Sequence, residues 1–363
     1  MSTWPEWLPI REDLKALSPY GAPQIEKVIA LNTNENPYPL PQQVVEQITT
    51  AISKIAPNLN RYPDRDAIEL RTQLAHYINK LNKTNFDFLN VWAANGSNEI
   101  LQTLMLTCGS RGALGFSPSY SMHPLIAKVC GVNWISGNRN TDFTLDLDSA
   151  LDEISKSNPS LVFITSPNNP TGNAIDILAL EKLALASQKV GALLVVDEAY
   201  EEFSSVNSAV TLLSKFKNIV VVRTMSKAFA LAGARCGYLI GDQKIVEMAL
   251  IARLPYHLSS QTQAIALAAL ANFEVLQAEV SLLKNERNRV SSELAKFGFS
   301  VIDSDANFLL FKGFKAEAKD IWQALLDDGI LIRDVGLTEF LRVTIGTPSE
   351  NDKFLTAIAK HRP

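Results

Sequence analysis

The sequence has few cysteines and no long uncharged stretch. Its three cysteines, Cys108, Cys130 and Cys236, are odd in number and share no C-x-x-C spacing, which argues against a disulfide framework and a thiolate metal site. No apolar run approaches the roughly 18 residues that a membrane span needs, and the first residues lack the pattern of a secretion signal. We therefore expect a soluble cytoplasmic protein without a metal centre.

An excess of charge of one sign is also missing. The 363 residues include 34 Lys and Arg against 38 Asp and Glu, a formal net charge of −4, and contain no run of five basic residues. Nucleic acids and anionic membranes attract strongly basic surfaces, so we expect neither as a partner. A hydrophobic content of 47% and a charged content of 20% are typical of a folded globular chain.

Helical periodicity alternates with short apolar runs over much of the chain. Four runs have the composition of strands buried on both faces, namely residues 112–117, 160–166, 191–199 and 218–224. This alternation predicts an α/β fold in which helices cover both faces of a mostly parallel sheet. Ligands bind at the carboxyl edge of such sheets, where several of these runs end in polar residues.

The length of the chain and the change in its pattern of helix and strand signals after about residue 255 predict one large domain and a smaller one. We expect an N-terminal arm (1–40), a large cofactor-binding domain (41–255), and a linking helix with a small α+β domain (256–363) that the N-terminal segment completes. The final helix is predicted to begin at Ser349, because an acidic residue follows this hydroxyl cap three positions later.

One lysine follows the last of the four predicted strands. Lys227 lies in TMSKAFALAGARCGY, among small and apolar neighbours that would partly remove it from water. Burial lowers the pKa of an ammonium group, and a neutral amine is what Schiff-base chemistry with an aldehyde cofactor requires. Taken alone, such a lysine is more often a surface residue.

An acidic residue ends the apolar strand GALLVVD. The carboxylate of Asp197 would emerge at the carboxyl edge of the sheet, where burial without a partner is costly. A protonated pyridine nitrogen would satisfy it, as in enzymes that use pyridoxal phosphate, although an N-cap for the next helix is an alternative. Tyr200, three residues later, could hydrogen-bond a phenolic oxygen of the same ring, or simply pack.

Two further turns follow predicted strands. In SPNNPTG the prolines and Gly172 fix a turn that presents Asn169, a possible partner of a phenolate oxygen. Tyr120, in SPSYSMH, could stack on an aromatic cofactor. In isolation, such an asparagine more often belongs to a structural turn, and such a tyrosine more often packs in the core or at its rim.

A phosphate could bind at two other elements. The run Gly96, Ser97 and Asn98 opens a predicted helix, whose free N–H groups and dipole attract anions. Polar residues on both sides of Lys227 could add to this site, namely Thr224, Ser226 and Arg235. A simple helix cap and a surface salt bridge are the alternatives.

All these motifs occur together and in a fixed order, and further segments accompany them: LNTNENPYP, RYPDRDA, RLPYHLSSQTQA, SDANFLLF and LRVTIGT. The chain resembles the fold-type I aminotransferases over nearly its whole length, and within them the enzymes that act on L-histidinol phosphate. The resemblance implies a pyridoxal 5'-phosphate enzyme of histidine biosynthesis. It would exchange an amino group between L-histidinol phosphate and 2-oxoglutarate, giving imidazole acetol phosphate and L-glutamate.

The resemblance also assigns residues to roles. Lys227 would be the Schiff-base lysine, Asp197 the partner of the pyridine nitrogen, and Asn169 and Tyr200 the ligands of the phenolic oxygen, with Tyr120 against the ring. The phosphate ligands would be Gly96, Ser97, Asn98, Thr224, Ser226 and Arg235. The family forms homodimers, so the resemblance implies that Tyr62 reaches the partner subunit's cofactor phosphate.

Four residues are expected on the substrate side. Arg342 and Arg333 lie on predicted strands, where guanidinium groups suit phosphates and carboxylates, with exposed salt bridges as the alternative. The resemblance places Tyr20 and Asn34 of the N-terminal arm beside them.

Other functions share part of this pattern. Aromatic amino-acid aminotransferases and threonine-phosphate decarboxylases have the same cofactor residues, but the NTNENPYP and PYHLSS segments favour histidinol phosphate. A DNA-binding regulator built on the same fold would need an added basic module, and a nucleotide-dependent dehydrogenase would need G-x-G-x-x-G after a strand. The sequence has neither.

Overall fold

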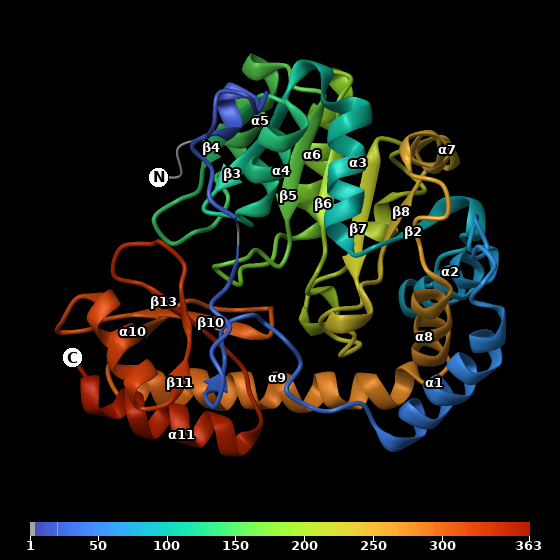
Figure 1. Cartoon of the computed structure of the whole chain (residues 1–363). Helices are drawn as coiled ribbons and strands as arrows, with labels where there is room; N and C mark the ends of the chain where they lie inside the picture. The colour runs from blue at the N-terminus through green and yellow to red at the C-terminus, as the bar shows by residue number, and fades with distance from the viewer. Residues whose placement is uncertain (1–3, 20) are drawn as a thin grey trace.

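The computed structural model describes residues 4–19 and 21–363, and its larger part is built on a seven-stranded sheet (Figure 1). The strand order is β2-β8-β7-β6-β5-β3-β4, and β8 runs antiparallel to both of its neighbours within an otherwise parallel arrangement. The strands are β2 (Val91–Ala94), β3 (Ala113–Ser117), β4 (Trp134–Asn138), β5 (Leu161–Thr165), β6 (Leu193–Asp197), β7 (Ile219–Thr224) and β8 (Gly237–Gly241). The four strands predicted from apolar runs are confirmed as β3, β5, β6 and β7.

Helices cover both faces of this sheet. One face packs against α3 (Ser97–Cys108), α4 (Met122–Cys130) and α7 (Gln243–Ala252), and the other packs against α5 (Leu147–Ser157) and α6 (Ile177–Lys189). Successive side chains of a strand alternate between faces, so Val195 joins the first layer and Val196 the second. Both faces are therefore buried, which explains why the strand sequences are continuously apolar.

Four helices lie beside the sheet, and one of them extends to the smaller part. Helix α8 (Ser260–Leu270) packs on α1 (Gln42–Ile55) and α2 (Ile68–Asn82), and the 24-residue α9 (Phe273–Lys296) runs beneath both parts of the molecule (Figure 1). Within residues 4–19 and 21–363, no single helix has the length and apolarity to cross a membrane. Helices α8 and α9 meet the combined criterion of length and apolar composition only when taken together, and they meet at a bend of 75°.

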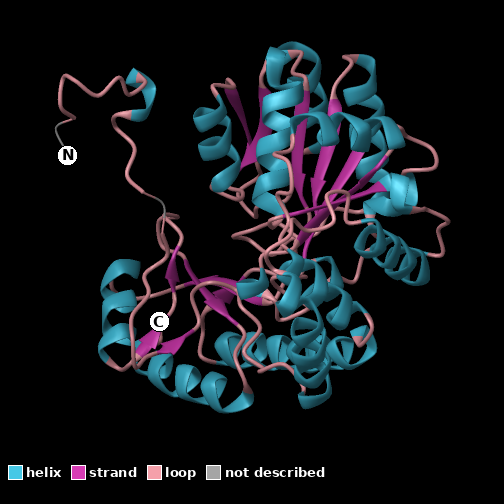
Figure 2. Ribbon diagram, turned by 45° about the vertical axis from the view of Figure 1, so that its right-hand side comes forward, coloured by secondary structure: helices cyan, strands magenta, loops and turns pink. Residues whose placement is uncertain are grey.

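A second, antiparallel sheet forms the smaller part (Figure 2). Its order is β12-β13-β10-β9, with β9 (Ser300–Val301), β10 (Phe308–Lys312), β12 (Arg333–Asp334) and β13 (Leu341–Thr344). Helices α10 (Ala318–Asp327) and α11 (Pro348–Ile358) lie beside it. Near the N-terminus, β1 (Ile29–Ala30) pairs in parallel with β11 (Ile330–Leu331), so the arm joins this part of the molecule.

The final helix begins at a different cap from the one predicted. The side chain of Thr347 accepts a hydrogen bond from the backbone N–H of Glu350, whose carboxylate accepts one from the N–H of Thr347. Pro348 fits the first helical position because it has no N–H to leave unpaired. The predicted cap at Ser349 is therefore wrong, since Thr347 offers the same hydroxyl-to-acid spacing together with a favourable proline.

Candidate active site

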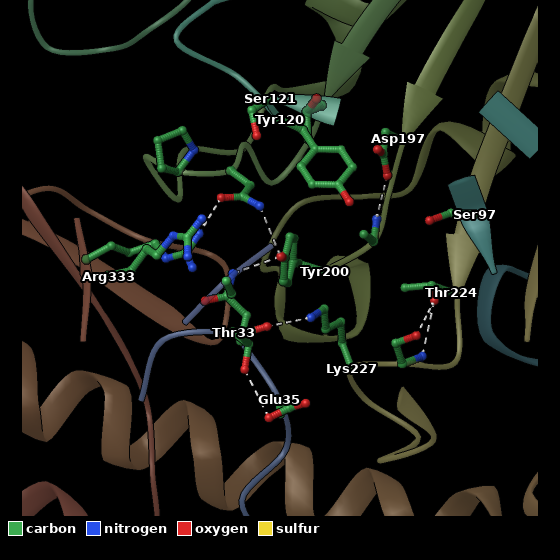
Figure 3. A pocket seen from close by; sticks show the side chains of 18 of the residues that line it. Thr33, Glu35, Ser97, Tyr120, Ser121, Asp197, Tyr200, Thr224, Lys227 and Arg333 are labelled. Carbon is green, nitrogen blue, oxygen red and sulfur yellow. Dashed lines mark hydrogen bonds between the residues drawn. The ribbon is translucent and has the colours of Figure 1, made fainter. Parts of the chain in front are cut away.

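A cavity of about 350 Å³ opens at the carboxyl edge of the large sheet, and residues of β12 and β13 in the second sheet also line it. It brings together most of the residues expected to bind cofactor or substrate (Figure 3). The expected residues that line it are Asn34, Ser97, Asn98, Tyr120, Asn169, Asp197, Tyr200, Thr224, Ser226, Lys227, Arg235, Arg333 and Arg342. Gly96 and Tyr62 do not line it, and Tyr20 lies outside the described residues.

Lys227 follows β7 and points into the cavity (Figure 3). Its Nζ donates a hydrogen bond to the backbone oxygen of Thr33 at 2.9 Å. Burial, together with the positive charges of Arg342 and Arg235, lowers the pKa of this amine to about 8, and the negative charge of Glu35 partly opposes these effects. A substantial fraction of this lysine is therefore neutral near physiological pH, as a nucleophilic amine requires.

The carboxylate of Asp197 is buried at the end of β6, with only 2% of the residue exposed. Its Oδ2 lies 3.1 Å from Nε2 of His123, and its Oδ1 accepts from the backbone N–H of Ala199. His123 was missed in the sequence analysis. The available signal was its position three residues after Tyr120, at the start of the helix that follows β3.

Tyr200 and Asn169 lie in contact with each other on the next part of the wall. The hydroxyl oxygen of Tyr200 accepts hydrogen bonds from Nδ2 of Asn34 at 2.9 Å and from Nδ2 of Asn169 at 3.4 Å. The other amide atom of Asn169, Oδ1, accepts from Nη1 of Arg342 at 2.6 Å. Asn34, expected on the substrate side, is thus also a direct neighbour of the tyrosine.

The N-terminus of α3 forms an anion cradle with the loop after β7. The hydroxyl of Thr224 donates to Ser226 at 2.9 Å, and Nη1 of Arg235 donates to the same serine at 3.4 Å. A methyl group at Gly96, which has φ +77°, would lie 2.6 Å from Nη2 of Arg235. The absence of that side chain makes room for the guanidinium beside the free N–H groups of the helix, a donor set that fits a phosphate.

Two arginines line another part of the cavity. Arg333 and Arg342 are directly paired across β12 and β13. Arg342 is buried, donates to the backbone oxygen of Asn32 at 2.8 Å, and lies 5.0 Å from the ring centre of Phe308. The cavity therefore has a second cationic wall that suits a phosphate or a carboxylate.

Tyr62 lies on the surface instead of in the cavity of its own chain. It is 79% exposed, and its ring stacks on Tyr256 at 4.3 Å between ring centres. Two large apolar side chains close to Tyr256 in the sequence, Ile251 and Leu254, are also strongly exposed. His257 hydrogen-bonds the backbone oxygen of Ala93 and does not line the cavity.

Comparison with known proteins gives consistent matches over nearly the whole chain. The family model described as aminotransferase class I and II matches residues 26–358. A histidinol-phosphate aminotransferase of Streptomyces avermitilis is 52% identical over 356 residues, which cover 97% of this chain and 96% of the relative. Another of that name, from Mycobacterium sp. strain JLS, is 50% identical and covers 97% and 94%.

A solved structure has the same fold. The histidinol-phosphate aminotransferase of Sinorhizobium meliloti, in complex with pyridoxal-5'-phosphate, superimposes with a TM-score of 0.80 at 24% identity. The superposition covers 92% of this chain and 91% of that one. The predicted α/β architecture, with helices on both faces of a mostly parallel sheet, is thereby confirmed, and the structure adds that the second sheet is antiparallel.

Proposed function

The chain belongs to the class I and II aminotransferases, and from this premise we propose that it is a histidinol-phosphate aminotransferase of histidine biosynthesis. It transfers the amino group between L-histidinol phosphate and 2-oxoglutarate. The observation that carries the proposal is one cavity in which the amine of Lys227 lies between an anion cradle and two arginines. The identity of about 50% to relatives of that name supports the choice of substrate.

The donor set of the cavity fits pyridoxal 5'-phosphate. Lys227 would hold it covalently, Asp197 would face its ring nitrogen, and Tyr200 with Asn169 would face its phenolic oxygen. The phosphate would lie in the cradle of Ser97, Asn98, Thr224, Ser226 and Arg235. When bound, this cofactor supplies an electron sink that stabilises negative charge at the substrate carbon that loses its proton.

The residues of the chain would provide binding, orientation and proton transfer. With a pKa near 8, Nζ of Lys227 is suited to take the proton from the carbon that bears the substrate amine. Asp197 is held by His123 and a backbone N–H, so its negative charge stays in a fixed position and orientation. Tyr120 would pack against the ring from the side of α4, since it precedes that helix.

The two arginines would bind the substrate anions. Histidinol phosphate carries a phosphate ester in place of the carboxylate of an ordinary amino acid, whereas glutamate carries two carboxylates. A guanidinium group binds either anion through two parallel hydrogen bonds. We assign Arg342 and Arg333 to this role, with Asn34 beside the substrate.

We also propose that the enzyme is a cytoplasmic homodimer, in which Tyr62 reaches the phosphate of the partner's cofactor. The proposal is supported by the exposure of Tyr62 and of the neighbouring apolar residues Ile251 and Leu254, which a partner would cover. Sedimentation of the active enzyme should give a two-chain species. A fully active monomer would contradict this arrangement.

The experiment that tests the proposed function follows the visible absorbance of the purified holoenzyme on addition of L-histidinol phosphate. We expect the band to bleach in the wild type and to remain unchanged in Lys227→Ala, which lacks the amine. Lys244→Ala, an exposed lysine that pairs with Glu247, is the matched control and should bleach normally. Transamination of phenylalanine in strong preference to histidinol phosphate would overturn the substrate assignment.

A further inference from the structure

Three successive residues of the N-terminal segment each bind a different side chain of the active site. We call residues 32–34 the strap. Their contacts are Asn32 O with Arg342 Nη2 at 2.8 Å, Thr33 O with Lys227 Nζ at 2.9 Å, and Asn34 Nδ2 with Tyr200 OH at 2.9 Å. The position of the strap therefore affects an anion-binding arginine, the reactive lysine and the tyrosine together.

The second sheet holds the strap in place through Asn34. The hydroxyl of Thr344 donates to Oδ1 of Asn34 at 3.0 Å and accepts from the backbone N–H of the same residue at 3.0 Å. The amide of Asn307 donates to the backbone oxygen of Asn34 at 3.1 Å. Asn34 has a left-handed backbone with φ +56°, and all three residues are buried, so these bonds maintain a conformation that the residue would otherwise disfavour.

The hydroxyl of Thr344 determines which end of the Asn34 amide faces Tyr200. Because Thr344 donates to Oδ1, the NH₂ group of Asn34 is directed to the tyrosine oxygen. A flipped amide would present an oxygen instead, which would accept the tyrosine's hydrogen. In the observed orientation the hydroxyl oxygen of Tyr200 accepts a hydrogen bond from Asn34. Accepting this bond polarises the O–H group and makes the hydroxyl a stronger hydrogen-bond donor.

Thr344 does not line the cavity, and its hydroxyl reaches the site through Asn34. It lies two residues after Arg342 on β13, and side chains at this spacing leave a strand on the same face. One short strand therefore carries both an anion-binding arginine and the residue that orients the strap. Among the described residues, Thr344 is the one whose side chain joins this strand to Asn34.

We propose that Thr344 is a positioning residue, whose hydroxyl sets the orientation of Asn34 and thereby makes Tyr200 a strong hydrogen-bond donor to the phenolic oxygen of the cofactor. The inference rests on the proposed function. It adds a residue that contacts neither cofactor nor substrate, and it links the second sheet to the electronic state of the cofactor.

The test compares Thr344→Val with the wild-type holoenzyme. A weaker donor at Tyr200 would leave more negative charge on the phenolic oxygen of the cofactor. That charge favours the protonated form of the nitrogen that joins Lys227 to the cofactor, so this nitrogen would keep its proton to higher pH. A pH titration of the visible band should therefore give a raised pKa in Thr344→Val. We expect kcat for histidinol phosphate to fall by roughly tenfold, the usual effect of one buried hydrogen bond, with KM changed by less than about twofold.

Two further variants separate positioning from general destabilisation. Thr344→Ser keeps the hydroxyl and should restore the wild-type titration and kcat. Thr347→Val removes a helix-capping hydroxyl three residues further along, outside the cavity, and should leave the pKa of the band unchanged. If Thr344→Val does not fold, Thr344→Cys keeps the volume, weakens the hydrogen bonds and should raise the pKa in the same direction.

The results that overturn the inference differ from those that overturn the function. A titration of Thr344→Val identical to that of the wild type, or an equal shift in Thr347→Val, shows that Thr344 does not position Tyr200. A wild-type enzyme that shows no visible cofactor band, or does not act on histidinol phosphate, instead removes the proposed function.

Discussion

Asp197 and Glu198 are consecutive acidic residues at the end of β6, and both are at most 3% exposed. Successive positions of a strand face opposite sides, so the two carboxylates lie in different surroundings. Asp197 lines the cavity and is held by His123 and one backbone N–H. Glu198 does not line it and is bound on every side by groups of its own chain.

The partners of Glu198 form a closed cluster. Its carboxylate accepts from two nitrogens of Arg223 at 3.1 and 2.9 Å, from the hydroxyl of Ser208 at 2.8 Å, and from the backbone N–H of Ala209 at 2.7 Å. Burial raises the pKa of Glu198, and the adjacent Arg223 counteracts that effect. This acid joins the ends of β6 and β7 to the following loop, which is a structural role.

The comparison shows that burial alone does not identify a functional acid. Both carboxylates have lost most of their contact with water, a loss that is costly without partners. The two residues differ in what their carboxylates face. Asp197 lines the cavity, whereas both carboxylate oxygens of Glu198 accept hydrogen bonds from groups of the protein itself. Mutations of the two residues should therefore affect different properties of the enzyme.

The largest effect is expected for Glu198→Ala. Removing Glu198 takes from the buried Arg223 one of its two counter-charges and the acceptor of two of its nitrogens, while Glu201 remains as the other counter-charge. Breaking a buried ion pair in this way costs up to about 3–5 kcal/mol of unfolding free energy. Urea denaturation should show this loss, while kcat per folded enzyme should stay within about twofold of wild type. A variant with normal stability and greatly reduced kcat would contradict the structural assignment.

Asp197→Asn should have the opposite profile. The substitution keeps the size of the side chain but removes the negative charge that faces the cavity. We expect kcat for histidinol phosphate to fall about 10²- to 10³-fold, as on removal of other preorganised electrostatic groups. The midpoint of urea denaturation should change little. Stopped-flow measurement of the first half-reaction is the assay, and an unchanged rate would remove Asp197 from the catalytic residues.

A smaller effect is expected for Glu202, a third acid near this cluster. Burial raises the pKa of Glu202 to about 7, with its Oε1 accepting from the hydroxyl of Tyr77. The folded protein then binds a proton that the unfolded chain releases at lower pH. The stabilisation that this proton provides is complete at pH values below the pKa of Glu202 in the unfolded chain. It is lost as the pH rises through about 7, the pKa of Glu202 in the folded protein.

Glu202→Gln should remove this dependence. The slope of unfolding free energy against pH, at most about 1.4 kcal/mol per unit for one proton, should become flatter between pH 5 and 7. Urea denaturation of both proteins at several pH values measures it. Identical slopes would show that Glu202 is not protonated in the folded state, and kcat should be unaffected in either case.

The parts that were predictable from the sequence depend on local patterns. Continuous apolar runs such as NIVVVRT identify strands buried on both faces, and Lys227 and Asp197 follow such runs directly, so both were expected at the carboxyl edge. The helix that begins at Ser97 was predicted from its Gly-Ser-Asn start. The resemblance supplied the roles, which remain proposals.

The parts that were not predictable depend on contacts between distant residues. His123 meets Asp197 from 74 positions away, and no periodicity in the sequence indicates that pairing. Asn34 and Thr344 are 310 positions apart, so their hydrogen bonds arise only when the N-terminal segment lies against β13. The misplaced cap at Ser349 had a local cause, because two hydroxyl residues at 347 and 349 offer the same acidic spacing.

The close approach of β8 to α3 limits what evolution or engineering can change. A methyl group at Gly237 would lie 2.4 Å from the main-chain nitrogen of Ser97, so any larger residue would push the first turn of the helix away. Strand and helix are thus in direct contact there, and this contact fixes the first turn of α3, beside which we propose that the cofactor phosphate binds. A redesigned enzyme that accepts a bulkier cofactor would need to begin by moving this helix, since no substitution at position 237 could widen the subsite gradually.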